Sequence, residues 1–370
     1  MQVGYDDSDA IRCGGLAKIC MQRYYSIMLE PKTFLLRPVR LRTTINEFSP
    51  NDCKNFFEFR QPDLFRLLRG LRFPAKCHLD GGSVMADEEV MLRGLYELVS
   101  GEDQHNISAN VFGREQTAQS RAFKFFVNHI YFTFYDLLTD NLEWWRDNGF
   151  LDESKAAITA KLRTLGIDIT DVFAFIDCNC LQIERVGGGP RQDGADADRW
   201  VSNVQRAFYN GWKSIHGLKH QSVAIAHGFT IDLYGPTSVR RNDLKLLADS
   251  HINGRLYRLL GDGWFMYGDS IYPRLSNLIS SWRCRPKTPR MKAENHHMKS
   301  VRIAIEWNYG ATSNLFHYLR NIDKLKLMRN THLTRVYFVC QLLRNCNVAL
   351  YGGIESNYFT NMLEMYLRVN

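Results

Sequence analysis

The sequence lacks the features that would mark a membrane, secreted or fibrous protein. No uninterrupted apolar run approaches the ~18 residues of a membrane-spanning helix. The first residues, Met1 to Asp9, are acidic and polar, whereas a secretory signal begins with basic residues and continues with an apolar segment. Internal repeats and low-complexity tracts are absent. We therefore expect a folded intracellular protein without a membrane partner.

Cysteine is sparse, and no familiar catalytic fingerprint is present. The nine cysteines are an odd number without the dense, regular spacing of a disulfide framework, which favours a reducing compartment. Cys178 and Cys180 share one face of a predicted strand, but no Cys/His pair nearby completes a zinc site, so we interpret them as buried thiols. A Gly-x-Ser-x-Gly turn and both glycine-rich nucleotide-binding fingerprints are missing. The glycines from Gly187 to Gly189 are therefore predicted to form a plain loop.

The composition is that of a globular protein with a basic surplus. Apolar residues make up 45% of the chain and charged residues 23%. Lys and Arg number 47 against 39 acidic residues, a formal net charge of +8 that favours a polyanionic partner, with nucleic acid the leading candidate. The 370 residues allow two domains or one elaborated domain.

The first half of the chain is predicted to be helical. Ser49-Pro50 is a typical helix start, and acidic residues at 87–89 followed by apolar residues at helical spacing predict a helix up to Gly101. A short helix over 108–112 and a long helix after Thr117 have the outline of a helix-turn-helix. Its basic and polar residues could face a DNA groove: Arg114, Gln119, Arg121 and Lys124. The alternative is a helical bundle whose exposed face is basic.

Strands dominate the next part of the chain. Apolar and β-branched residues predict a buried strand over 171–183 that carries Asp177, and two shorter strands that meet in a hairpin at His227-Gly228. Two helices, a fourth strand ending at Asp269 and a long helix containing Glu306 follow, over 242–252, 254–260, 264–269 and 295–319. A basic loop before the long helix, with Arg283, Arg285 and Lys287, is either a solvated connection or a clamp on a phosphate backbone.

Three acids of this region occupy positions that suit metal chemistry. Asp177 lies on the first strand, Asp269 ends the fourth, and Glu306 lies on the following helix. Mg²⁺ takes oxygen ligands and keeps several waters, so a few converging carboxylates can bind it. Two such ions, ~4 Å apart, can activate an attacking oxygen and stabilise the leaving one. Taken singly, each acid also has a structural explanation: a strand-end polar group, a turn residue or an exposed helix carboxylate.

Several stretches resemble one family in the same order. From residue 70 onward the sequence is similar to the Harbinger-type (PIF/Harbinger) DDE superfamily endonucleases, which are transposase-derived. The stretches are Phe175-Ile-Asp-Cys-Asn, Gln205-Arg-Ala-Phe-Tyr-Asn-Gly-Trp-Lys, His216-Gly-Leu-Lys, Gly235-Pro, Arg241-Asn-Asp, Tyr267-Gly-Asp-Ser-Ile-Tyr-Pro and Val301-Arg-Ile-Ala-Ile-Glu. Helical segments before them and Leu343-Arg-Asn after them are similar too. Residues 1–60 gain nothing from this resemblance.

The resemblance implies an RNase H-like fold and metal-dependent cutting or joining of DNA. Carried over residue by residue, the catalytic and metal-binding triad falls on Asp177, Asp269 and Glu306, with two Mg²⁺ or Mn²⁺ ions. The sequence departs from the family at Cys178, where glycine usually follows the first acid. Asp243 matches an acid common after the third strand, and we rank it as auxiliary or structural.

We therefore predict an α+β chain: a helical, helix-turn-helix-like part and then an RNase H-like core with a mixed sheet flanked by helices. The expected parts are an undetermined segment 1–60, a DNA-binding region 61–168, a nuclease domain 169–320 and a helical extension 321–370. DNA is the expected partner, contacted by the basic residues of the helical part and of the loop, in the nucleus. A separate DNA-binding protein and self-association are further candidate partnerships. The alternative is a domesticated DNA-binding or scaffold protein that keeps the fold without cleavage.

Overall fold

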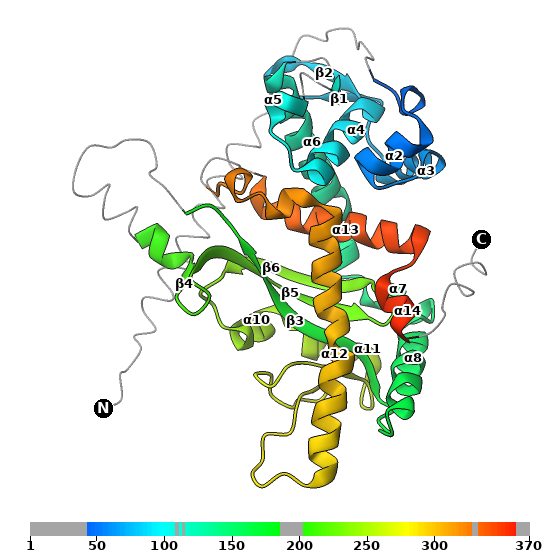
Figure 1. Ribbon diagram of the computed structural model, residues 1–370, viewed down its shortest axis with the longest axis vertical. Coiled ribbons are helices and arrows are strands. Elements are labelled where there is room, and N and C mark those ends of the chain that lie inside the picture. The colour runs from blue at the N-terminus through cyan, green and yellow to red at the C-terminus, as the bar shows by residue number, and fades with distance from the viewer. Residues whose placement is uncertain (1–42, 108–110, 113–114, 186–202, 328–331, 360–370) are drawn as a thin grey trace.

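A mixed β-sheet forms the centre of the fold (Figure 1). The computed structural model describes residues 43–107, 111–112, 115–185, 203–327 and 332–359. The strands of this sheet are β3 (Val172–Gln182), β4 (Tyr209–Asn210), β5 (Ile215–Ile225), β6 (Thr230–Ser238), β7 (Phe265–Tyr267) and β8 (Leu278–Ile279). β3 pairs antiparallel with β5, and β5 antiparallel with β6, while β7 and β8 continue the sheet in parallel on the other side of β3. Apart from the short β4, the order is third, second, first, fourth and fifth strand, which is an RNase H-like core, as the sequence predicted.

Helices cover both faces of the sheet. Successive residues of a strand point to opposite faces. Ala174 and Ile176 therefore pack in one apolar cluster with α7 (Leu142–Asp147), α10 (Asp243–Ser250) and α11 (Ile252–Leu260). Phe175 points the other way, into a cluster with α8 (Phe150–Thr164) and α12 (Pro289–Leu315). Asp177 is two residues after Phe175, so its side chain points to the same face of the sheet, the face covered by α12.

The helical N-terminal part shares a core with the C-terminal helix α13 (Leu333–Tyr351). Its elements are α2 (Pro50–Phe57), α3 (Gln61–Leu71), α4 (Asp87–Ser100), α5 (Gln104–Ile107), α6 (Gln116–Thr139) and a small hairpin of β1 (Lys76–His78) and β2 (Val84–Ala86). The remaining helices are short. They are the 3₁₀ helices η1 (Ile45–Glu47), η2 (Asp80–Gly82), η4 (His317–Arg320) and η5 (Ile322–Lys324), and the α-helix α14 (Ile354–Phe359). The helix start predicted at Ser49 and the helix end predicted at Gly101 are both observed. The Ser49 side chain accepts a hydrogen bond from the Asp52 amide, and Gly101 ends α4 with φ 63°.

A buried polar network ties α4 to α6. The Arg93 guanidinium is fully buried and donates to Glu89, to the Gln119 side chain at 3.0 Å and to the Phe112 carbonyl at 3.2 Å. The Gln119 amide in turn donates to Glu97 at 3.0 Å. The expectation that Gln119 faces a DNA groove is therefore wrong, because its side chain has no exposure and its polar atoms pair with α4.

The helix-turn-helix stays a prediction. The long helix is confirmed as α6, but most of the predicted short helix lies outside the described residues, as do Arg114 and the glycines from Gly187 to Gly189. The predicted domain boundaries also stay predictions, although Leu181, Leu218 and Leu233 of the sheet belong to the apolar cluster of the N-terminal helices. Within the ranges given above, no helix is long and apolar enough to cross a membrane.

Candidate active site

Two of the three predicted acids come from neighbouring parallel strands, Asp177 within β3 and Asp269 just after the end of β7. Phe175 of β3 is paired with Tyr267 of β7, so Asp177 and Asp269 each follow a paired residue by two positions. The Asp177 side chain is 18% exposed, and its Oδ1 accepts a hydrogen bond from the Cys178 amide at 2.8 Å. Asp269 lies in the turn after β7, where its Oδ1 accepts from the Ile271 amide at 2.9 Å. Backbone pairing therefore brings together two carboxylates that are far apart in the sequence.

The third acid, Glu306 of α12, is linked to Asp177 by the side chain of Arg302. Arg302 donates from one terminal nitrogen to Asp177 Oδ2 at 2.8 Å and from the other to Glu306 Oε1 at 2.7 Å. The Arg302 side chain is 13% exposed, whereas that of Glu306 is 50% exposed. A single guanidinium thus joins two predicted metal ligands, the strand carboxylate below and the helix carboxylate at the surface.

The charges at this place form one electrostatic cluster. Burial raises the pKa of Asp177, the Arg302 charge and the Cys178 amide oppose that rise, and Asp269 and Asp243 add to it. Burial alone would lower the pKa of Arg302, but Asp177, Glu306 and Asp269 outweigh it and raise that pKa. Asp177, Asp243, Asp269 and Glu306 thus each act on the pKa of Asp177 or of Arg302.

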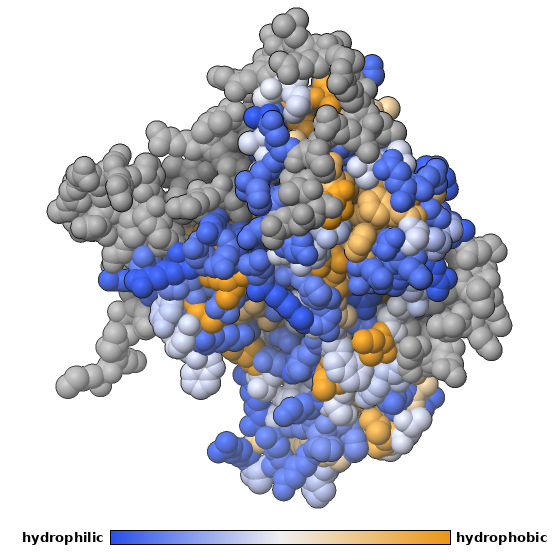
Figure 2. Space-filling view, turned by 45° about the horizontal axis from the view of Figure 1, so that its top comes forward, coloured by the Kyte–Doolittle hydropathy of each residue, from blue (hydrophilic) through white to orange (hydrophobic). Residues whose placement is uncertain are grey.

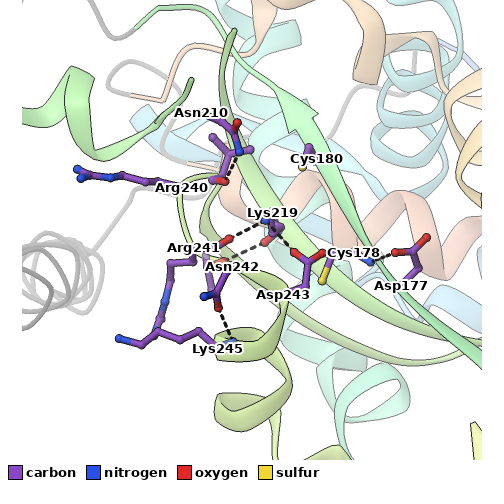
Figure 3. A network of polar contacts seen from close by, with 12 residues as sticks. Asp177, Cys178, Cys180, Asn210, Lys219, Arg240, Arg241, Asn242, Asp243 and Lys245 are labelled. Atoms are coloured by element: carbon purple, nitrogen blue, oxygen red, sulfur yellow. Dashed lines mark hydrogen bonds and ion pairs between the residues drawn. The ribbon is translucent and has the colours of Figure 1, made fainter. Parts of the chain in front are cut away.

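Asp243 has a cation of its own (Figure 3). Lys219 of β5 is nearly buried and donates to Asp243 Oδ1 at 2.8 Å and to the Arg241 carbonyl at 2.6 Å. Asn242 caps α10 by accepting from the Lys245 amide, which fixes Asp243 in the first turn of that helix. This pairing gives Asp243 a structural explanation, in keeping with its rank as auxiliary.

Two free thiols, Cys178 and Cys180, lie on the same strand as Asp177. Cys178 lies between Asp177 and Asp243 in Figure 3, and its Sγ is 3.4 Å from the Tyr272 hydroxyl. Burial raises the Cys178 pKa well above the usual thiol value, so this side chain stays protonated. Both Cys178 and Cys180 are half-buried rather than fully buried, and both are free thiols. Cys178 therefore fills the position that resembles the family's glycine without adding charge.

The residues fit a divalent metal in their chemistry but do not stand ready to hold one. All donors are carboxylate oxygens, the type that Mg²⁺ and Mn²⁺ prefer, and two of them already converge on one cation. In the described part of the chain, no group of three or more His, Cys, Asp or Glu residues is placed to hold a metal ion. The cation that bonds both Asp177 and Glu306 is the Arg302 guanidinium.

The basic residues predicted to contact DNA fall into two places. The loop before α12 lies at the end of that helix remote from the N-terminal helices, on a largely hydrophilic surface (Figures 1 and 2). In this loop Arg285 is exposed, Lys287 is half-buried, and Arg283 donates to the Tyr272 carbonyl at 3.0 Å. On α6, Lys124 pairs with Asp80 at 2.6 Å and the Arg121 guanidinium lies against Gly81. The α6 residues are thus engaged with η2, whereas in the loop Arg285 is exposed.

Sequence reasoning missed two cations of the site. Arg302 precedes Glu306 by one helical turn, and this spacing alone could have indicated a pair along the helix. Its bond to Asp177 joins residues 125 positions apart, and nothing local indicates it. Lys219 likewise meets Asp243 only through the packing of β5 against α10.

One family model matches the chain, over residues 195–345, and its description is DDE superfamily endonuclease. This stretch is similar to the DDE endonucleases. It contains Asp269 and Glu306 and begins after Asp177. The match supports the DDE superfamily and a nuclease or transposase-like function, while the Harbinger-type subgroup stays a prediction. No curated protein and no solved structure matches the chain.

Proposed function

We propose that the chain is a metal-dependent DNA endonuclease that performs transposase-like phosphoryl transfer through Asp177, Asp269 and Glu306. One observation carries the proposal: Asp177 and Asp269 come from paired neighbouring strands, and Glu306 meets Asp177 at the same guanidinium. Buried charges are paired or coordinate metals, and here two carboxylates from a strand and a helix already share one cation, Arg302.

Each residue has a distinct role in this proposal. Asp177 is fixed in the middle of the sheet by the Cys178 amide, and Asp269 is fixed by its own turn, so both carboxylates are oriented in advance. Glu306 is half exposed, so a DNA backbone could reach its carboxylate from solvent. Two Mg²⁺ or Mn²⁺ ions held by these oxygens would supply charge neutralisation and an activated attacking oxygen. Arg283, Arg285 and Lys287 would hold backbone phosphates beside the site.

A second candidate function is a DNA-binding or scaffold protein that has lost cleavage. The Arg302 bridge favours it, because a guanidinium that stayed between Asp177 and Glu306 would replace the metal as counter-ion. Both candidates predict DNA binding and a nuclear location. Both are also compatible with a separate DNA-binding partner protein and with self-association. They differ in whether a divalent ion binds and DNA is nicked.

Metal should stabilise the protein and be required for cleavage. Mg²⁺ or Mn²⁺ at about 100 times its Kd should add about 2.7 kcal/mol to the free energy of unfolding, a rise of several degrees in melting temperature. Supercoiled plasmid should be nicked with either ion and left intact with excess EDTA. Nicking by pure protein in EDTA, or no melting shift at any Mn²⁺ concentration, contradicts the mechanism.

DNA affinity should depend on salt through the loop before α12. Each phosphate contact contributes about −0.9 to the slope of log affinity against log salt concentration, so losing three contacts should flatten that slope by about 2.7. The measurement is fluorescence anisotropy of a labelled duplex over a range of salt, with the triple Gln variant of Arg283, Arg285 and Lys287.

The matched control removes three other surface charges. Lys54, Arg66 and Arg163 are partly exposed and pair with Glu58, Asp63 and Asp168. Their triple Gln variant lowers the net charge equally but should leave the salt slope within about 0.5 of wild type, since only contacted phosphates release counter-ions. Equal slopes in the two triple variants would assign DNA binding to net charge rather than to the loop.

A further inference from the structure

Arg302 competes with a metal ion for one oxygen of each of two predicted metal ligands. Its two terminal nitrogens bond Asp177 Oδ2 and Glu306 Oε1. Such charge-assisted bonds are short and strong, and a second cation at the same oxygens would be repelled by the first. Metal loading at these ligands therefore requires Arg302 to leave.

The structure allows Arg302 to leave while the ligands stay. Asp177 remains fixed without the arginine, because its Oδ1 accepts from the Cys178 amide and its carbonyl accepts from the Tyr309 hydroxyl at 2.8 Å. Arg302 extends from α12 on a long, flexible side chain that is 13% exposed, next to Glu306, which is 50% exposed. Its planar fork matches a phosphate as well as it matches carboxylates.

We propose that Arg302 is a counter-ion that exchanges with the metal and then binds a DNA phosphate beside it. This inference rests on the proposed metal-dependent function. It adds a coupling between the binding of the metal and the binding of DNA. Without DNA, Arg302 competes with the metal for Asp177 and Glu306. A phosphate at the site withdraws the guanidinium and adds negative charge, so DNA strengthens metal binding, and by thermodynamic linkage the metal strengthens DNA binding by the same factor.

The test measures Mn²⁺ affinity of the full chain by isothermal titration, with and without a phosphorothioate duplex that keeps its charge and resists cleavage. For the wild type, the duplex should tighten Mn²⁺ binding about tenfold, within the usual range of such couplings. Arg302→Gln should bind Mn²⁺ about tenfold more tightly than wild type without DNA, and the duplex should add little. Arg302→Lys keeps the charge, so it should retain the weak affinity of the wild type.

Arg163→Gln is the control, because it removes one positive charge from an exposed pair on α8 and should leave Mn²⁺ affinity and coupling unchanged. Arg302→Gln that binds Mn²⁺ no more tightly than wild type, or that keeps the full DNA effect, overturns the exchange. Loss of Mn²⁺ binding in the Gln variant also overturns it, because Arg302 would then help to build the site. Tight, DNA-coupled Mn²⁺ binding without nicking refutes only the nuclease proposal, and absence of Mn²⁺ binding in every variant refutes both.

Discussion

Asp269→Asn should abolish DNA nicking while DNA affinity stays close to that of wild type. Asparagine keeps the size of the side chain, and its amide oxygen can still accept from the Ile271 amide, so the turn after β7 is preserved. The variant loses the charge that a hard cation requires, and we expect nicking to fall by at least about 10³-fold. Removing a negative charge beside the phosphate path should not weaken DNA binding and could strengthen it without metal.

Asp177→Asn and Glu306→Gln should give the same loss, because the three carboxylates act as a unit. A double variant should therefore be little worse than a single one. Nicking and anisotropy are measured side by side, with Asp168→Asn as control, since Asp168 is an exposed carboxylate paired with Arg163. Near-normal nicking by any one variant would show that the assignment is wrong at that position, and Asp243 would become the next candidate.

Arg93→Met should lower the free energy of unfolding by about 3–5 kcal/mol, the usual effect of breaking a buried ion pair. The Arg93 and Glu89 side chains are both fully buried and paired at 3.0 Å. Methionine fills similar space but removes this partner of the Glu89 carboxylate. It also removes the hydrogen bonds that Arg93 donates to the Gln119 side-chain oxygen and to the Phe112 carbonyl. Because α4 packs on both α2 and α6, the helical part should lose its structure first.

The comparison variant is Lys54→Met, which breaks a pair with the same spacing at the surface of α2. Lys54 and Glu58 are 2.9 Å apart, with side-chain exposures of 46% and 31%. An exposed pair of this kind contributes about 0.3–0.5 kcal/mol. Urea unfolding followed by circular dichroism compares the two variants. Similar destabilisation by both would mean that the Arg93 network contributes little beyond an ordinary helix pair.

Local pattern was sufficient for most elements of the nuclease core. The strand with Asp177, the hairpin after it and the helix capped by Asn242 were all predicted, because alternation and capping are properties of a few adjacent residues. The fifth strand, β8, was missed because two residues carry no periodicity. The long helix begins at Pro289 rather than at Asn295, and the Thr288-Pro289 cap that starts it was hidden among basic loop residues.

Polar residues inside the helical part were the harder case. Gln119 was expected at a DNA surface because it neighbours basic residues near the start of a helix. The fold instead buries it against Arg93 and Glu97, which come from another helix. A sequence pattern cannot distinguish a polar residue that faces water from one that meets a partner 26 positions away.

The sequence by itself indicated most of the strands and helices in their order and placed the three candidate acids on or just after them, because those features depend on residues close along the chain. It also indicated the Arg302–Glu306 pair through one-turn spacing, although that signal was not used. Only the tertiary structure decided that the strands of Asp177 and Asp269 are neighbours, that Lys219 pairs with Asp243, and that Arg302 bonds both Asp177 and Glu306. These contacts follow from strand register and from the packing of α12 over the sheet, and both are set by burial of apolar side chains throughout the core rather than by any residue near the site.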